Sequence, residues 1–150
     1  MTRVRLAALV VGALVVCAPA AASDPVPITT LRLDGVSFSP ELALDGDARA
    51  TGLMRRKRAP KDGMLFVFPG PTTGGFWMKN TLVPLRIVFF NSHGARVRAL
   101  TMKPCRRDPC PIYDPGRRYR FALELGATDR RRATRLGPQG RLSRLMRSAS

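Results

Sequence analysis

The stretch that decides the fold runs from Gly63 to Asn91 and reads GMLFVFPGPTTGGFWMKNTLVPLRIVFFN. It contains the only tryptophan of the chain, Trp77, and five of its seven phenylalanines. Two apolar runs, Met64–Phe68 and Leu85–Phe90, have the length and composition of buried strands. The segment between them is rich in glycine, proline and threonine. We therefore expect a rigid β scaffold that presents its functional residues on a loop.

Segments on both sides of this stretch also have the pattern of strands. Period-two alternation of apolar and polar residues predicts three half-buried strands. They would cover Thr29–Leu33, Ala95–Leu100 and Arg118–Leu125. In the second of them, Ala95, Val97 and Ala99 would share one face. Val36–Leu44 reads as a further strand that Pro40 interrupts.

One segment favours a short helix. Gly46–Arg58 carries a weak apolar stripe, and Asp45 or Asp47 can cap its first turn. Residues 91–94, Asn-Ser-His-Gly, predict the turn of an antiparallel hairpin. Together these elements predict a mainly β fold, a compact antiparallel β-sandwich or barrel-like single domain with one or two short helices.

The N-terminal residues have the composition of a secretory signal peptide. Met1–Arg5 is basic, Leu6–Val16 is uniformly apolar, and Ala20–Ala22 supplies small residues for cleavage. The apolar run is shorter than the roughly 20 residues that a bilayer-spanning helix needs. Cys17 follows a valine rather than a small residue, so we expect no lipid anchor. We expect export to the periplasm or the extracellular space through a Sec-type signal.

The predicted organisation follows from this signal. It consists of a cleaved signal peptide over residues 1–22, a flexible leader over 23–27, one β domain over 28–145 and a C-terminal tail over 146–150. No internal repeat or long linker divides the domain, and we expect a monomer.

Export also decides how the cysteines are interpreted. Removal of the signal leaves Cys105 and Cys110, in the segment KPCRRDPCP. An even pair in an exported protein favours a disulfide, and a proline before each cysteine suits a small closed loop. Two free thiols are the alternative. The spacing differs from that of a CxxC redox motif, and two cysteines are too few for a four-cysteine zinc site, so we expect a structural disulfide.

The chain is strongly basic. It has 26 Lys and Arg against 10 Asp and Glu, a formal charge of +16 that becomes +14 without Arg3 and Arg5. The excess gathers in residues 55–61 and 130–147. Aromatic residues are not interleaved with these runs, as stacking of a single strand requires, so we expect no nucleic-acid partner. An envelope polymer or an anionic lipid surface is the polyanion that an exported protein would meet, and a merely solvated basic surface is the alternative.

Three segments of the chain carry a recognisable pattern. They are Arg49-x-x-Gly52-Leu53-Met54-x-Arg56, Gly63-Met64-Leu65-Phe66, and Phe76-Trp77-Met78-Lys79-Asn80-Thr81 with Pro84-Leu85. With Cys105, Cys110 and the run Leu123-Glu124-Leu125, they resemble the DUF192 family of small, often exported prokaryotic domains. The resemblance covers about residues 28 to 145. It implies a β-rich, sandwich-like single domain and implies no activity.

The chain departs from the family pattern at three places. Arg86 stands where the family usually carries an acid after Leu85, and Thr51 stands where an arginine is usual. The closing glycine region reads Leu125-Gly126-Ala127-Thr128 and Gly137-Pro138-Gln139-Gly140. If the missing acid is functional in relatives, its replacement by a base speaks against an enzyme here.

Catalytic groups are sparse along the chain. The single histidine, His93, falls in a predicted turn, and no HExxH or GxSxG pattern is present. We therefore expect no metal and no cofactor. A soft copper site is the metal alternative, although methionines more often fill a core. Its ligands would be Met54, Met64, Met78 and Met102 with His93. A hydrolase with a carboxylate pair, such as Glu41 and Glu124, stays open, as does a structural envelope-associated protein.

Phe76–Thr81 best suits a ligand, because Trp77 offers stacking surface, Lys79 a cation and Asn80 an amide. In an extended strand Phe76, Met78 and Asn80 face one side and Trp77, Lys79 and Thr81 the other, so one face should lie in the core. A purely structural Trp77 is the alternative. We expect a binding module rather than an enzyme, for a sugar, a small anionic ligand or an envelope polymer. Its predicted site residues are Trp77, Lys79, Asn80, Arg49 and Arg56.

Overall fold

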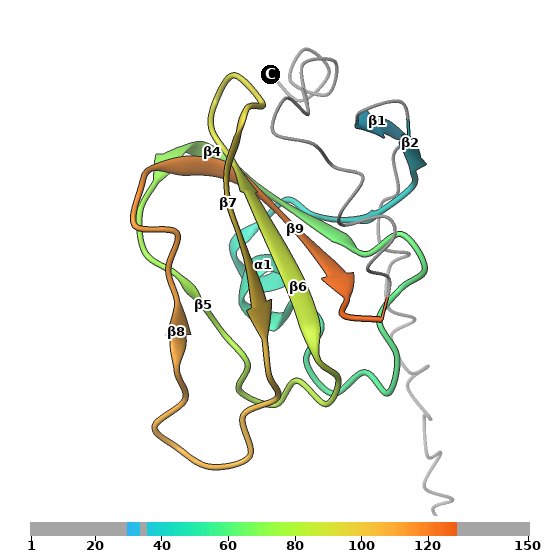
Figure 1. The fold of residues 1–150 in the computed structure, drawn as a ribbon, viewed down its shortest axis with the longest axis vertical. Helices are drawn as coiled ribbons and strands as arrows, with labels where there is room; N and C mark the ends of the chain where they lie inside the picture. Colours follow the sequence, from blue (N-terminus) through green and yellow to red (C-terminus); the bar gives the residue numbers. More distant parts are fainter. Residues whose placement is uncertain (1–29, 34–35, 129–150) are drawn as a thin grey trace, which may run out of the picture.

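The computed structural model describes residues 30–33 and 36–128 (Figure 1). The predicted signal peptide, leader and C-terminal tail lie outside these residues, so their boundaries stay predictions. Within the described ranges no helix is both long and apolar enough to span a membrane.

Five strands form the central sheet, in the spatial order β3-β4-β9-β6-β7 (Figure 1). They are β3 (Glu41–Ala43), β4 (Met64–Thr72), β6 (Leu85–Phe90), β7 (Arg96–Met102) and β9 (Tyr119–Gly126). Strand β3 runs parallel to β4, and all other neighbours are antiparallel. The two apolar runs of the 63–91 stretch are therefore β4 and β6, with the late strand β9 inserted between them.

Smaller elements flank this sheet. Strands β1 (Leu31–Leu33) and β2 (Val36–Phe38) form an antiparallel pair, and β5 (Phe76–Trp77) pairs antiparallel with β8 (Ile112–Tyr113). The helix among the described residues is α1 (Gly46–Thr51). This mainly β architecture with one short helix confirms the predicted fold class.

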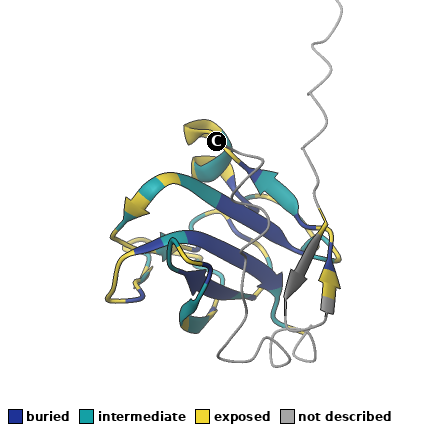
Figure 2. Ribbon diagram, turned by 90° about the horizontal axis from the view of Figure 1, so that it is seen from above, coloured by how far each residue is buried: buried dark blue, intermediate teal, exposed yellow. Residues whose placement is uncertain are grey.

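The sheet carries a hydrophobic core on each face, and its middle strands are buried (Figure 2). Along β6, Val88 and Phe90 face one core, whereas Ile87 and Phe89 face the other, as alternation along a strand requires. The hairpin-side core contains Phe38, Leu65, Val88, Phe90, Phe121, Leu123 and Leu125. The helix-side core contains Ala43, Leu53, Met64, Phe66, Met78, Leu85, Ile87, Phe89, Met102, Tyr119 and Ala122.

The helix is shorter than predicted. Asp45 caps it, since its carboxylate accepts a hydrogen bond from the Ala48 N–H at 2.7 Å. Gly52 ends it with φ +47°, a conformation that favours glycine, while a Cβ there would lie 3.1 Å from the Phe66 ring. The predicted continuation of the helix to Arg58 was wrong for this reason.

Strand β7 departs from simple alternation. Arg98 lies opposite Phe89 and Arg96 opposite Phe90, so the register shifts by one residue between them. Val97 consequently packs against the helix-side core and Ala99 against the hairpin-side core. The prediction that these two residues share a face was wrong, because a β-bulge adds a residue to one strand of a pair.

Candidate functional site

The segment that contains Trp77 lies beside the central sheet and turns one side toward the core. Phe76 packs edge-on against the Phe66 ring, with centroids 4.9 Å apart, and Met78 is fully buried. On the other side, the Trp77 side chain is 48 % exposed. Its partner across the β5–β8 pair, Ile112, is 60 % exposed. One face of this segment therefore lies in the core, as the alternation predicted, and it is the face that carries Phe76 and Met78.

The alternation breaks after Lys79. Asn80 has φ +57°, and the Arg55 N–H donates to its carbonyl oxygen at 2.7 Å. This left-handed residue reverses the chain, so that Asn80 is exposed and Thr81 is buried. The predicted sides of these two residues were wrong, because the strand pattern assumed an extended backbone where the chain makes a turn.

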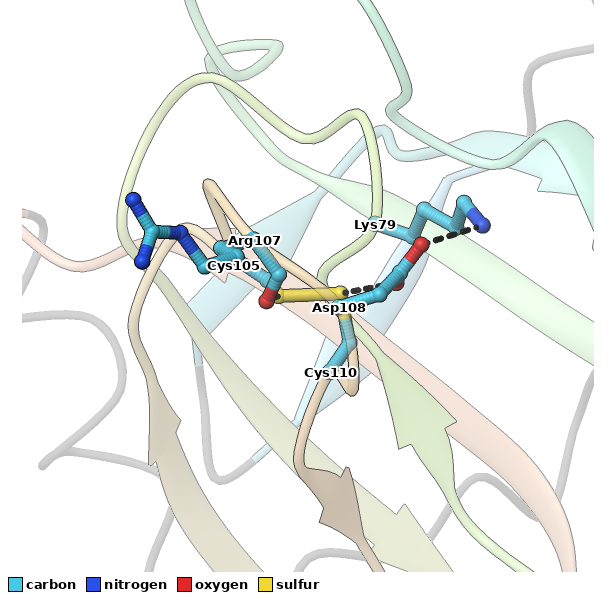
Figure 3. Close-up of polar contacts among 5 residues, drawn as sticks. All are labelled: Lys79, Cys105, Arg107, Asp108 and Cys110. Atoms are coloured by element: carbon cyan, nitrogen blue, oxygen red, sulfur yellow. Dashed lines mark hydrogen bonds and ion pairs between the residues drawn. A yellow bond between two sulfur atoms is a disulfide. The ribbon is translucent and has the colours of Figure 1, made fainter.

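A cation and a carboxylate lie next to the exposed indole. The Lys79 Nζ lies 5.6 Å from the centre of the Trp77 ring. It also lies 2.9 Å from a carboxylate oxygen of Asp108 (Figure 3). Asp108 belongs to the loop that the Cys105–Cys110 disulfide closes. Cys105 and Lys79 also form an isolated parallel β-bridge. The backbone N–H of Cys105 donates a hydrogen bond to the Met78 carbonyl oxygen at 3.3 Å. The predicted disulfide is confirmed, and it holds Asp108 near Lys79.

The two predicted arginines make contacts within the domain. Arg49 donates to the carbonyl oxygens of Leu44 and Val67, and its guanidinium lies 5.3 Å from the Phe68 ring centre. Arg56 forms an ion pair of 2.7 Å with Glu41. The hydrogen bonds, ion pair and cation–π contact that the two arginines form with described residues all lie away from Trp77 and Lys79.

The structure thus brings together part of the predicted site and adds two residues to it. Trp77 and Lys79 lie side by side, and Asp108 and Ile112 join them to form what we call the indole patch. Sequence reasoning missed both added residues, because they are 31 and 35 positions beyond Trp77 and reach it only through the β5–β8 pairing and the disulfide. The prolines and cysteines around Asp108 were the available signal that this loop is ordered.

The two candidate carboxylates lie on one face of the sheet, on either side of Met64. Glu41 and Glu124 are each the cross-strand partner of that residue. Glu41 is engaged by Arg56. Glu124 is only 4 % exposed, and burial raises the pKa of its carboxyl from 4.5 to about 8. The two carboxyls share a face of the sheet, but a substrate would have no open path to a carboxyl that is buried as deeply as that of Glu124.

Arg86, the departure from the family pattern, lies in the middle of the sheet. It is the cross-strand partner of Leu125 and Thr101. Its Nε is buried and has no hydrogen-bond partner in the part of the chain that the structure describes. The basic residue therefore occupies a half-buried strand position rather than the indole patch.

Comparison with known proteins gives a family and two similar folds. A family model for DUF192, described as an uncharacterized ACR, matches residues 29–137. A crystal structure from Sinorhizobium meliloti 1021, described as a candidate transcription regulator, is 30 % identical, with a TM-score of 0.63 over 76 % of this chain and 88 % of that one. A protein of unknown function from Novosphingobium aromaticivorans DSM 12444 is 24 % identical, with a TM-score of 0.68 over 84 % of this chain and 92 % of that one. No curated protein matches.

Proposed function

Because the chain belongs to the DUF192 family, whose description assigns no activity, we propose a function from its own surface: an exported carbohydrate-binding module that stacks a sugar ring on Trp77. The observation that carries the proposal is the half-exposed indole, the only one in the chain, with a charged pair at its edge. An exposed aromatic face costs free energy in water, and a bound sugar face would cover it.

The charged pair favours a sugar over an anion at this place. Asp108 neutralises Lys79 at 2.9 Å, so the pair has no net charge to attract an anionic group. It offers instead ammonium donors and carboxylate acceptors side by side, and sugar hydroxyls both donate and accept. Ile112, at 60 % exposure, extends the apolar platform beyond the indole.

Residues 1–22 support the exported part of the proposal, since their composition is that of a secretory signal. The exported protein, with a formal charge of +14 once Arg3 and Arg5 are removed, would meet envelope polymers, in which sugars and anionic groups occur together. We therefore propose an envelope glycan as the target, with the basic surface aiding approach and the indole patch supplying specificity.

Fluorescence tests the proposal directly, because Trp77 is the only tryptophan and reports on its own surroundings. The purified protein would be titrated with a neutral N-acetylglucosamine tetrasaccharide, with maltotetraose and with a DNA duplex. We expect a saturable change in the emission with at least one saccharide and none with DNA. Saturation by DNA alone would instead support the description that the Sinorhizobium relative carries.

Three variants locate the binding. Asp108→Asn keeps the tryptophan and can be followed by fluorescence, whereas Trp77→Ala is followed by calorimetry. We expect each to weaken saccharide binding by about tenfold, since each removes an interaction of roughly 1–1.5 kcal/mol. Leu82→Ala, which shortens an exposed apolar side chain outside the indole patch, is the matched control and should bind as wild type does. Full saccharide affinity in Trp77→Ala would refute the proposal.

A further inference from the structure

A cavity of about 490 Å³ opens at one end of the interior strands β6 and β9 of the central sheet. Three segments far apart in sequence line it: the loop of residues 57–61, the pair Val83–Pro84 just before β6, and residues 126–128 at the end of β9. The start of β6 and the end of β9 lie side by side there (Figure 1). Leu85 and Gly126 are cross-strand partners. We call this cavity the basic pocket.

The charged residues among the described lining of the pocket are of one sign. Lys57, Arg58 and Lys61 contribute three cations, and none of the lining residues that the structure describes is acidic. None of the three forms an ion pair or a hydrogen bond with another described residue. The nearest acid in sequence, Asp62, accepts a hydrogen bond from the Ser39 N–H at 3.0 Å. A concave surface lined by unpaired cations concentrates the field and attracts anions.

Backbone hydrogen bonds hold the walls of the pocket. The Gly63 N–H donates to the Pro60 carbonyl at 3.0 Å, which closes the turn that carries Lys61. The Ala127 N–H donates to the Pro84 carbonyl at 3.0 Å, which joins the other two segments. The backbone that carries the cations is therefore held in place before a ligand binds, so that less conformational entropy is lost on binding.

Apart from Thr128, the other described lining residues are apolar. They are Ala59, Pro60, Val83, Pro84, Gly126 and Ala127. A volume of 490 Å³ is far larger than a single phosphate group and falls within the range of about 300–1,000 Å³ that holds small organic ligands. The pocket therefore suits a ligand that combines a multiply charged anionic group with an apolar body.

We propose that the basic pocket binds a small organic phosphate, with the phosphate group among Lys57, Arg58 and Lys61 and the organic body against Val83 and Pro84. A phosphomonoester carries close to two negative charges at neutral pH and three strong acceptor oxygens, which three cations can match. The inference does not depend on the proposed carbohydrate function, since the two sites share no residue.

Calorimetry with two phosphates tests both halves of the proposal. Phenyl phosphate carries an apolar body, and inorganic phosphate does not. We expect phenyl phosphate to bind the purified protein about tenfold more tightly than inorganic phosphate, since burying a ring of this size adds more than 1.4 kcal/mol. Equal affinities would overturn the role of the apolar wall, and no saturable binding of either would overturn the site.

A charge-matched pair of variants separates the pocket from general basicity. The triple change Lys57→Gln, Arg58→Gln and Lys61→Gln should weaken phenyl phosphate binding by about tenfold or more, from three charge contacts of modest strength each. The control triple, Lys103→Gln, Arg106→Gln and Arg117→Gln, removes the same charge from exposed residues outside the pocket. It should change the affinity less than about twofold once salt screens distant charges. Equal losses in both triples would overturn the proposal.

Vesicles distinguish the source of the phosphate. Phosphatidic acid in a phosphatidylcholine vesicle presents the same phosphomonoester at a membrane surface. If the pocket takes a free small molecule, soluble phenyl phosphate should bind without vesicles and should compete with any vesicle binding. Binding to the vesicles that phenyl phosphate does not displace would overturn the assignment to the pocket.

Discussion

Glu124 is an acidic residue in the interior of a β-sheet. It lies on the helix-side face of β9 between Met64 and Ile87, its partners on the two neighbouring strands. Both partners are apolar and buried. The carboxyl therefore loses water without gaining a compensating charge, which raises its pKa to about 8 and keeps it protonated at neutral pH.

This carboxyl should make the stability of the protein depend on pH. In the unfolded chain its pKa lies near 4.5, so between about 4.5 and 8 the folded state holds a proton that the unfolded state releases. The free energy of unfolding should therefore fall as pH rises through this window, by roughly 2–4 kcal/mol. Urea unfolding at pH 5 and pH 8.5 measures the change.

Glu124→Gln is the matched control for that experiment, because the amide keeps the shape and has no proton to lose. The variant should lose most of the decline between pH 5 and pH 8.5. A decline of wild-type size in Glu124→Gln would mean that other groups cause it.

Gly63 is a second residue whose identity is required by its surroundings. It has φ +77°, and a Cβ at this position would overlap the Glu124 carbonyl oxygen and approach the Leu125 side chain. Gly63→Ala should lower the free energy of unfolding by at least about 2 kcal/mol, from backbone strain and steric overlap. Gly46→Ala is the control. A Cβ added at Gly46 would have nothing within 4 Å, and this residue begins α1. The variant should therefore leave the free energy of unfolding unchanged or raise it slightly. Thermal unfolding of both variants makes the comparison, and equal losses would contradict it.

At the level of elements, the indole patch rests on short pieces of chain. Strands β5 and β8 have two residues each, and such a pair is weak on its own. The disulfide between Cys105 and Cys110, with a sequence separation of 5, closes the loop just before β8. The isolated β-bridge between Cys105 and Lys79 connects this loop to the segment that follows β5.

Loss of the disulfide should act mainly on this part of the molecule. The double change Cys105→Ser and Cys110→Ser should lower the free energy of unfolding by about 2 kcal/mol, the value expected for so short a loop. The Lys79–Asp108 pair should loosen as well, since Asp108 lies inside the loop. Urea unfolding and Trp77 quenching by acrylamide measure the two effects. Unchanged stability and quenching would show that the β5–β8 pair does not depend on the disulfide.

The local sequence pattern predicted those strands well whose structure depends on neighbouring residues along the chain. The apolar run Leu85–Phe90 coincides with β6, because a continuous apolar run suits a strand covered on both faces. Strand β4 extends to Thr72, beyond the predicted Phe68, despite Pro69 and Pro71. It tolerates these prolines because its pairing with β9 skips from Val67 to Thr72.

Features that depend on the pairing of distant segments could not be predicted from local sequence patterns. The insertion of β9 between β4 and β6, and the meeting of Ile112 with Trp77, depend on partners far along the chain. Reversals of the backbone were missed for another reason. Asn80 adopts φ +57° in a segment whose side chains read as a strand, because a hydrogen bond from Arg55 fixes it from outside.

At the scale of the whole molecule, the central sheet unites the two cores. Neighbouring residues of β6 and β9 enter opposite cores, so neither core can be lost without disturbing the strands of the other. A domain of this size with shared strands should unfold in one cooperative step. The β5–β8 pair joins that step through Phe76, whose ring lies 5.7 Å from that of Phe89.

One substitution in each core tests whether the domain unfolds in a single cooperative step. Phe89→Ala should cost about 3–5 kcal/mol and Val88→Ala about 1.5–3 kcal/mol, according to the apolar volume that each removes. In both variants, circular dichroism of the strands and fluorescence of Trp77 should report the same urea midpoint. A fluorescence transition that precedes the circular dichroism transition would show that the β5–β8 pair unfolds as a separate unit.

The position of β9 also has a consequence for the order of events in folding. It is the last described strand along the chain and the middle strand of the sheet. Until residues 119–126 have emerged, whether from a ribosome or across a membrane, β4 and β6 have no partner between them and both leave an edge unpaired. Such long-range pairing slows folding and exposes apolar edges in the meantime. Until β9 is present, the nascent chain therefore exposes apolar strand edges of the kind that a holding chaperone binds.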